Sequence, residues 1–152
     1  KRQVYFLACA GVAIGPRSIL TAGHCVDATG AQALFADADT FLTTGSGKET
    51  ATVEQLPGDR ALLTPARDLE HWVSTAAPPA SGTVDIVRLN TSVIVTEPAV
   101  IDGQRFLSPM VDHGQSGSPL GVGDVAIGVV LTCTSPDDKM CAPNGGSFGL
   151  VP

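Results

Sequence analysis

The stretch with the clearest capacity for chemistry is Gly114-Gln115-Ser116-Gly117-Ser118-Pro119, in which one serine stands between glycines. A serine hydroxyl is a weak nucleophile, so a catalytic serine needs a base beside it and backbone N–H donors that face the developing oxyanion. Glycines allow a tight turn and let a substrate carbonyl approach the backbone closely. The same pattern is also typical of an ordinary turn in a glycine-rich chain, so other residues must decide between the two interpretations.

Two further polar residues could complete such a site. His24 lies just past an apolar segment that ends at Ala22, and Asp59 follows a Pro-Gly turn at the start of another apolar run. An imidazole can accept the serine proton, and a carboxylate on its other nitrogen fixes the tautomer and stabilises the imidazolium. In the order His24, Asp59, Ser116, these residue types predict acyl-transfer chemistry. Four other aspartates are alternatives for the carboxylate: Asp37, Asp39, Asp68 and Asp85.

Composition limits the class of protein. The chain has 152 residues, of which 43% are hydrophobic and 16% charged, with 17 glycines, 11 prolines and a formal net charge of -6. This length supports a sizeable core, and the many turn residues favour short strands over long helices. The negative charge, without any basic run, argues against nucleic acid or an anionic membrane surface as a partner. No apolar stretch is long enough to predict a transmembrane span.

Short strands would position these residues. In the N-terminal half, 4–8 and 11–14 are predicted as two short strands or one bent strand, and further strands are predicted at 18–22, 33–36, 40–43, 50–56 and 61–63. A proline-rich connection over about 64–83 follows, with room for a helical turn around 68–73. In the C-terminal half, strands are predicted at 83–89, 92–96, 99–101, 104–107, 118–122, 125–132 and 147–151. The pattern indicates two small, mostly antiparallel β units.

The four cysteines, Cys9, Cys25, Cys133 and Cys141, fall into an N-terminal and a C-terminal pair. Four cysteines permit three connectivities, of which local pairing is the simplest. Disulfides would indicate an oxidising compartment, such as a secreted or periplasmic location. The apolar run at 4–14 also has features of a signal peptide, but a cysteine inside it favours strands. No Cys-x-x-Cys motif occurs, and His71 and His113 lie far in sequence from any cysteine, so a zinc site is not expected. No cofactor is predicted.

Three motifs together resemble the trypsin and chymotrypsin-like serine proteases: Thr21-Ala22-Gly23-His24-Cys25, Asp59-Arg60-Ala61-Leu62-Leu63 and Gly114 to Pro119. In that family the cysteine after the catalytic histidine bonds to one sixteen positions earlier, which implies a Cys9–Cys25 disulfide here, since 25 - 9 = 16. The resemblance implies an all-β fold of two antiparallel six-stranded barrels packed at right angles, with the active site between them. One peptidase domain would cover 1–152, with barrels at about 1–75 and 83–152.

The resemblance also implies a role for each residue. Ser116 would be the nucleophile, His24 the general base and then the acid, and Asp59 the orienting carboxylate. The backbone N–H groups of Gly114 and Ser116 would form the oxyanion hole. Met110, six residues before the nucleophile, would lie at the base of the specificity pocket, which disfavours a tryptic preference. The other residues expected to contact substrate are His113, Leu131, Thr132, Cys133 and Gly146, with a Cys133–Cys141 disulfide beside the pocket.

Three positions depart from the family pattern. Gln115 replaces the aspartate that, in animal proteases, pairs with an N-terminus released on zymogen cleavage, so that activation route is not expected and an activating partner or ligand is one alternative. Arg60 stands where the family usually has an aliphatic residue, and Ser118 where it usually has glycine. The predicted function is a serine endopeptidase acting on protein or peptide substrates. The alternatives are a catalytically inactive, protease-like binding protein and an esterase that uses the same triad.

Overall fold

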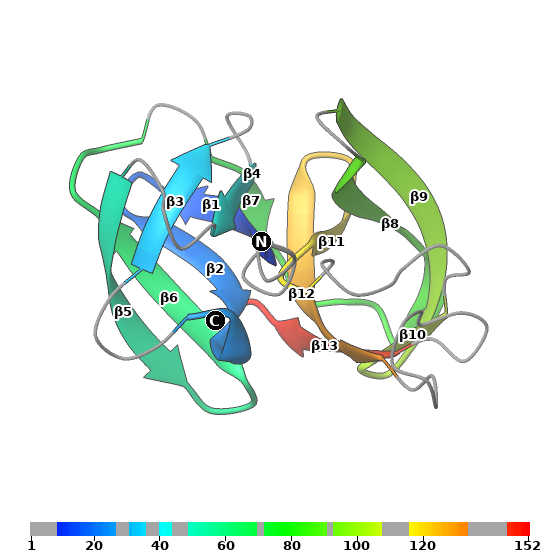
Figure 1. The fold of residues 1–152 in the computed structure, drawn as a ribbon. Helices are drawn as coiled ribbons and strands as arrows, with labels where there is room; N and C mark the ends of the chain where they lie inside the picture. Colours follow the sequence, from blue (N-terminus) through cyan, green and yellow to red (C-terminus); the bar gives the residue numbers. More distant parts are fainter. Residues whose placement is uncertain are drawn as a thin grey trace.

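The computed structural model describes residues 9–26, 31–35, 40–43, 49–69, 72–90, 93–107, 116–133 and 146–152. Most of these residues lie in β-strands, arranged as two β units side by side (Figure 1). Within these ranges the one helical element is the short 3-10 turn η1 (Gly23–Cys25), so no helix there is long and apolar enough to cross a membrane. The predicted all-β fold class is therefore confirmed.

The first β unit is a closed antiparallel barrel with the strand order β1-β2-β6-β5-β3-β4. Its strands are β1 (Cys9–Gly15), β2 (Ser18–Ala22), β3 (Ala31–Phe35), β4 (Thr40–Thr43), β5 (Glu49–Leu56) and β6 (Arg60–Pro65). A cluster of Ala13, Ile19, Leu63 and Leu69 fills part of its interior. Closure pairs each of these strands with a neighbour on both sides.

The second β unit is a sheet with the order β11-β8-β9-β10-β13-β12-β7. Its strands are β7 (Ser74–Thr75), β8 (Ser81–Asn90), β9 (Val93–Asp102), β10 (Arg105–Leu107), β11 (Pro119–Val122), β12 (Val125–Cys133) and β13 (Gly146–Leu150). Because β11 pairs with both β8 and β12, six of these strands also form a ring, to which β7 adds a short parallel pairing. The interior holds Val84, Ile86, Ala99, Ile101, Phe106, Leu120, Ile127, Val130 and Phe148.

A third apolar cluster joins the two units. Val12, Leu20 and Ala22 of the first barrel pack with Val129 and Leu131 of β12. Strand β2 is consequently buried on both faces, with Ile19 toward the barrel interior and Leu20 toward β12. This double burial explains why Ile19 and Leu20 are both apolar at adjacent positions instead of alternating with polar residues. It also fixes the strand that leads directly into His24.

Three details of the strand prediction need correction. The strands predicted at 92–96 and 99–101 are one strand, β9, which continues through Pro98 opposite Asp85. Proline is tolerated there because, among the described residues, β10 pairs with β9 only from Val100 onward, which leaves Pro98 at an open edge. The connection contains an unpredicted strand, β7, and its described residues 68–69 and 72–73 are not helical. The strand predicted at 4–8 lies outside the described residues.

Candidate active site

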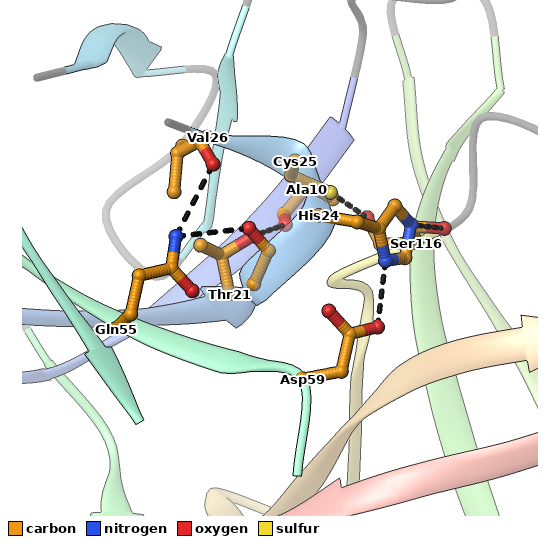
Figure 2. Close-up of polar contacts among 9 residues, drawn as sticks. Ala10, Thr21, His24, Cys25, Val26, Gln55, Asp59 and Ser116 are labelled. Atoms are coloured by element: carbon orange, nitrogen blue, oxygen red, sulfur yellow. Dashed lines mark hydrogen bonds and ion pairs between the residues drawn. The ribbon is translucent and has the colours of Figure 1, made fainter. Parts of the chain in front are cut away.

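His24 sits in the 3-10 turn η1, immediately after the buried strand β2. The Gly23 N–H donates a 2.6 Å hydrogen bond to the backbone oxygen of Asp59. Gln55, on β5, donates through Nε2 to the carbonyl of Val26, just after the turn (3.2 Å; Figure 2). The same Nε2 also donates to the carbonyl of Gly23, the first residue of the turn (3.1 Å). A Cβ at Gly23 would stand 2.7 Å from Oε1 of Gln55 and 3.0 Å from the backbone carbon of Asp59, so a larger residue here would displace the Gln55 amide. The turn is thus held on the neighbouring β5–β6 hairpin.

Asp59 lies in the tight turn between β5 and β6, following Gly58. Its φ of 59° places it in the left-handed region, where Asp and Asn occur more often than other side-chain-bearing residues. Gly58 precedes it with a φ of 81°. The hairpin turn therefore explains both the Pro-Gly signal in the sequence and the position of the carboxylate beside η1.

Ser116 is held between the two β units. Its carbonyl accepts a 2.9 Å hydrogen bond from the N–H of Ala10 on β1, while the next residue, Gly117, donates a 2.8 Å bond to the carbonyl of Val130 on β12. Gly117 has a φ of 86°, and a Cβ there would stand only 1.7 Å from the carbonyl oxygen of Ala10. That same oxygen accepts a 2.8 Å bond from the buried hydroxyl of Thr21. Glycine at 117 is therefore required by both backbone conformation and space.

The three predicted polar side chains meet in this structure. Nδ1 of His24 lies 2.7 Å from Oδ2 of Asp59, and Nε2 lies 3.0 Å from Oγ of Ser116 (Figure 2). Because an ionised carboxylate only accepts hydrogen bonds, the ring proton belongs on Nδ1 and leaves Nε2 to accept the serine proton. The side chains of His24 and Asp59 are 47% and 38% exposed, so the array is open to solvent. This geometry permits attack by Ser116 with proton transfer to His24.

The remaining predicted site residues are placed only in part. Thr132 and Cys133 belong to β12 and pair with Ser147 and Gly146 of β13. Leu131 is buried in the apolar cluster between the two units, with 9% of its surface exposed. Four predicted site or disulfide residues lie outside the described residues: Met110, His113, Gly114 and Cys141. The specificity pocket and the oxyanion hole therefore stay predictions.

Three residues around the array were not given a site role by the sequence: Thr21, Gln55 and Arg60. Each donates to backbone carbonyls of segments that carry the predicted triad or support it. A partner that is a backbone carbonyl leaves no trace in residue type or spacing, because every residue has one. The only available signals were the position of Thr21 inside the His24 motif and the departure of Arg60 from the family pattern.

Comparisons with known proteins agree with this architecture. A family model described as Trypsin matches residues 1–68. Human heparin binding protein superposes with a TM-score of 0.62 at 15% identity, over 99% of this chain and 87% of that chain. A search of curated proteins found no match.

Two further solved structures are similar over 94% of this chain and 83% of theirs. Mouse neuropsin, a serine protease of the brain's limbic system, gives a TM-score of 0.63 at 16% identity. Kallikrein-related peptidase 10 gives 0.62 at 14% identity. At such identities the structural likeness establishes the fold alone. The family match is evidence from sequence, and it concerns residues 1–68. The chain therefore has the chymotrypsin-like fold, and its N-terminal part matches the Trypsin family model.

Proposed function

We propose that this chain is a serine endopeptidase that hydrolyses peptide bonds through Ser116, His24 and Asp59. The observation that carries the proposal is the continuous contact from Oδ2 of Asp59 through the imidazole to Oγ of Ser116, over 2.7 Å and 3.0 Å. The match to a protease family supports a protein or peptide as the substrate. No group of three or more side chains that could hold a metal ion occurs among the described residues. The proposed reaction does not involve a metal ion.

In the proposed reaction, Oγ of Ser116 attacks the carbonyl carbon of the scissile peptide while Nε2 of His24 takes its proton. Asp59 keeps the imidazole oriented and stabilises it when it becomes charged. Backbone N–H groups of Gly114 and Ser116 would hold the oxyanion. The imidazolium then protonates the leaving amine, and water activated by the same imidazole releases the acyl group. What supports the placement of Ser116 is its backbone, which hydrogen-bonds to both β units through Ala10 and the adjoining Gly117.

The decisive experiment is labelling of the purified chain with a fluorophosphonate, followed by intact mass and peptide mapping. We expect one adduct, on Ser116, and its loss in Ser116→Ala together with a fall in turnover of several orders of magnitude. Ser74→Ala, which removes an exposed serine of β7, is the control and should label normally. A label that persists in Ser116→Ala would contradict the nucleophile assignment.

Absence of any label on the folded chain would favour the alternative, a catalytically inactive protease-like protein that binds a partner. One structural relative is named for heparin binding. The formal charge of -6 disfavours a polyanion as the partner of this chain, because a polyanion requires clustered positive charge. If the chain does label, ester and peptide substrates compared on the unlabelled enzyme distinguish an endopeptidase from an esterase that uses the same triad.

We also propose that residues 1–152 form one peptidase domain, with Cys9–Cys25 and Cys133–Cys141 disulfides and an oxidising location. What supports the first disulfide is that no free cysteine occurs among the described residues, which include Cys25. Disulfides form and persist in oxidising compartments. A thiol titration of the denatured, unreduced chain should detect no thiols. Four thiols would contradict both the pairing and the location.

A further inference from the structure

Arg60 connects the hairpin that carries Asp59 with the second β unit. It is the first residue of β6 and follows Asp59 directly in the chain. Its Nε donates a 2.9 Å hydrogen bond to the carbonyl of Pro57, in the same hairpin turn. Its Nη1 donates a 3.0 Å bond to the carbonyl of Leu150, the last residue of β13. One guanidinium therefore holds backbone atoms of both units.

The space for this side chain is made by a glycine on β13. A Cβ at Gly149 would stand 2.7 Å from Cγ and 3.0 Å from Cδ of Arg60, so any larger residue would displace the arginine. Arg60 is half-buried, and its bond to the Leu150 carbonyl is partly buried, whereas its bond to the Pro57 carbonyl is exposed. Hydrogen bonds from a charged donor are stronger than neutral ones, and a planar guanidinium offers donors in fixed directions.

Asp59 depends on its backbone for orientation. Within the described ranges, His24 is the one hydrogen-bond donor to its carboxylate, so no second side chain fixes the carboxylate plane. Its φ of 59° is disfavoured for a residue with a Cβ, and a turn in such a conformation persists only when its surroundings hold it. The surroundings that hold it are the 2.6 Å bond from the Gly23 N–H and the two bonds made by Arg60.

We infer that Arg60 is a positioning residue, which holds the Asp59 turn against β13 and thereby keeps the carboxylate in line with the imidazole of His24. The side chain acts on the backbone and touches neither His24 nor Ser116 in the described contacts. Its effect on rate rests on the proposed function, whereas its effect on the His24–Asp59 hydrogen bond does not. An arginine in place of the family's usual aliphatic residue thus has a specific structural task here.

The test compares Arg60→Gln with Arg17→Gln. Arg17 is a matched control because it also donates to a backbone carbonyl, that of Pro65 (3.2 Å), and pairs with Asp68 (3.2 Å). It precedes β2, whereas His24 follows that strand, so it lies at the opposite end of the strand from the site. Arg60→Lys keeps the charge and the aliphatic stem but cannot donate in two fixed directions at once.

Two readouts are measured on each folded variant. The first is the downfield proton NMR resonance of the His24 Nδ1–H shared with Asp59, assigned by its absence in His24→Gln. The second is the rate of fluorophosphonate labelling of Ser116. In Arg60→Gln we expect the resonance to broaden or vanish and labelling to slow by about tenfold or more, since small misplacements of catalytic groups are costly. Arg60→Lys should be intermediate, and Arg17→Gln should match the wild type in both.

An unchanged resonance and a labelling rate within about twofold of the wild type in Arg60→Gln would overturn the inference, because a positioning role predicts losses well beyond that. If Arg60→Gln does not fold, the folded Arg60→Lys variant decides by the same criteria. If the wild type takes no label but shows the resonance, the proposed function fails while the NMR comparison still tests Arg60. If the control Arg17→Gln loses the resonance as fully as Arg60→Gln, the inference also fails.

Discussion

At the residue scale, the structure separates Asp59 from the aspartates that the sequence left as alternatives. Asp68 pairs with Arg17, 3.2 Å away, and Asp85 lies within β8, between Pro98 and Gly121 of its neighbouring strands. Asp59 alone among these three contacts His24. Asp37 and Asp39 lie outside the described residues. The left-handed turn after Gly58 gives a physical reason for an aspartate at this position, since Asp tolerates that conformation.

Asp59→Asn tests whether Asp59 is the carboxylate that orients His24. The amide can no longer hold the imidazole in the tautomer that leaves Nε2 as an acceptor, so we expect kcat/KM or labelling rate to fall roughly 10⁴-fold. The fold should persist, because Asn also tolerates a positive φ. Asp68→Asn is the control and should retain full rate. A normal rate in Asp59→Asn, with thermal unfolding as a check of the fold, would move the orienting role to another carboxylate.

Gly117 illustrates how a catalytic turn can depend on space as well as on conformation. Gly117→Ala would place a Cβ 1.7 Å from the Ala10 carbonyl oxygen, which is fixed by Thr21, so we expect it to lower the free energy of unfolding by about 3 kcal/mol or more. Gly123→Ala shares a positive φ, 60°, but has nothing within 4 Å, and should cost only about 1 kcal/mol. Urea unfolding of both variants measures the difference. Equal losses would mean that backbone conformation alone requires glycine at 117.

The sequence predicted the residues of the array but not the residues that support it. His24 and Ser116 are recognisable because nucleophilic catalysis needs particular residue types in a particular order. Gln55 and Arg60 act on backbone carbonyls of Gly23, Val26, Pro57 and Leu150. Such contacts depend on which segments the fold brings together, so no local pattern could have predicted them.

At the scale of elements, the turn η1 and the hairpin β5–β6 form one supporting unit for His24 and Asp59. Strand β2 pairs with β6 as far as Ala22 opposite Arg60, so the segment after β2 emerges beside the hairpin turn. Gln55, near the end of β5, then bonds both ends of η1. The relative position of imidazole and carboxylate is therefore set by two adjacent strands and one amide side chain.

Gln55→Glu removes this amide while keeping the size of the side chain. A carboxylate cannot donate to the carbonyls of Gly23 and Val26, so we expect a loss of about 1–2 kcal/mol in the free energy of unfolding. The labelling rate should fall about tenfold, because the turn that carries His24 loosens. Glu54→Gln, the reverse change at the exposed neighbour on β5, should alter neither. A normal labelling rate in Gln55→Glu would show that η1 holds its place without the amide.

The strand prediction succeeded where residue types mark the turns that end a strand. It failed where the bounds of a strand depend on pairing with distant strands. Ser18–Ala22 and Thr40–Thr43 were predicted with their observed bounds, because Gly and polar residues end them. Pro98 was wrongly taken as the end of a strand, because only the three-dimensional structure shows that β9 continues through it while paired with Asp85 of β8. Strand β7 has only two residues, which is too short for any periodicity to predict.

At the scale of the whole molecule, the proposed site depends on how the two β units join. His24 and Asp59 come from the first barrel, whereas Ser116 precedes β11 of the second unit and bonds to β1 through its carbonyl. Leu20, Val12 and Ala22 pack with Val129 and Leu131 between the units. Strand β2, which leads directly into η1, supplies two members of this apolar cluster. The packing of this cluster therefore helps to fix the distance between Nε2 of His24 and Oγ of Ser116.

Substitutions of two leucines can distinguish the stability of the first β unit from the packing between the two units. Leu20 and Leu63 are each fully buried, and each lies four residues from a triad member, but Leu20 packs between the units and Leu63 inside the first barrel. Leu20→Ala and Leu63→Ala should each cost about 2–5 kcal/mol in the free energy of unfolding. Under conditions where both variants are folded, only Leu20→Ala should slow fluorophosphonate labelling of Ser116, because only its cavity lets one unit shift against the other. Equal labelling rates would mean that the hydrogen bonds of Ala10 and Gly117 suffice to hold the serine beside the imidazole.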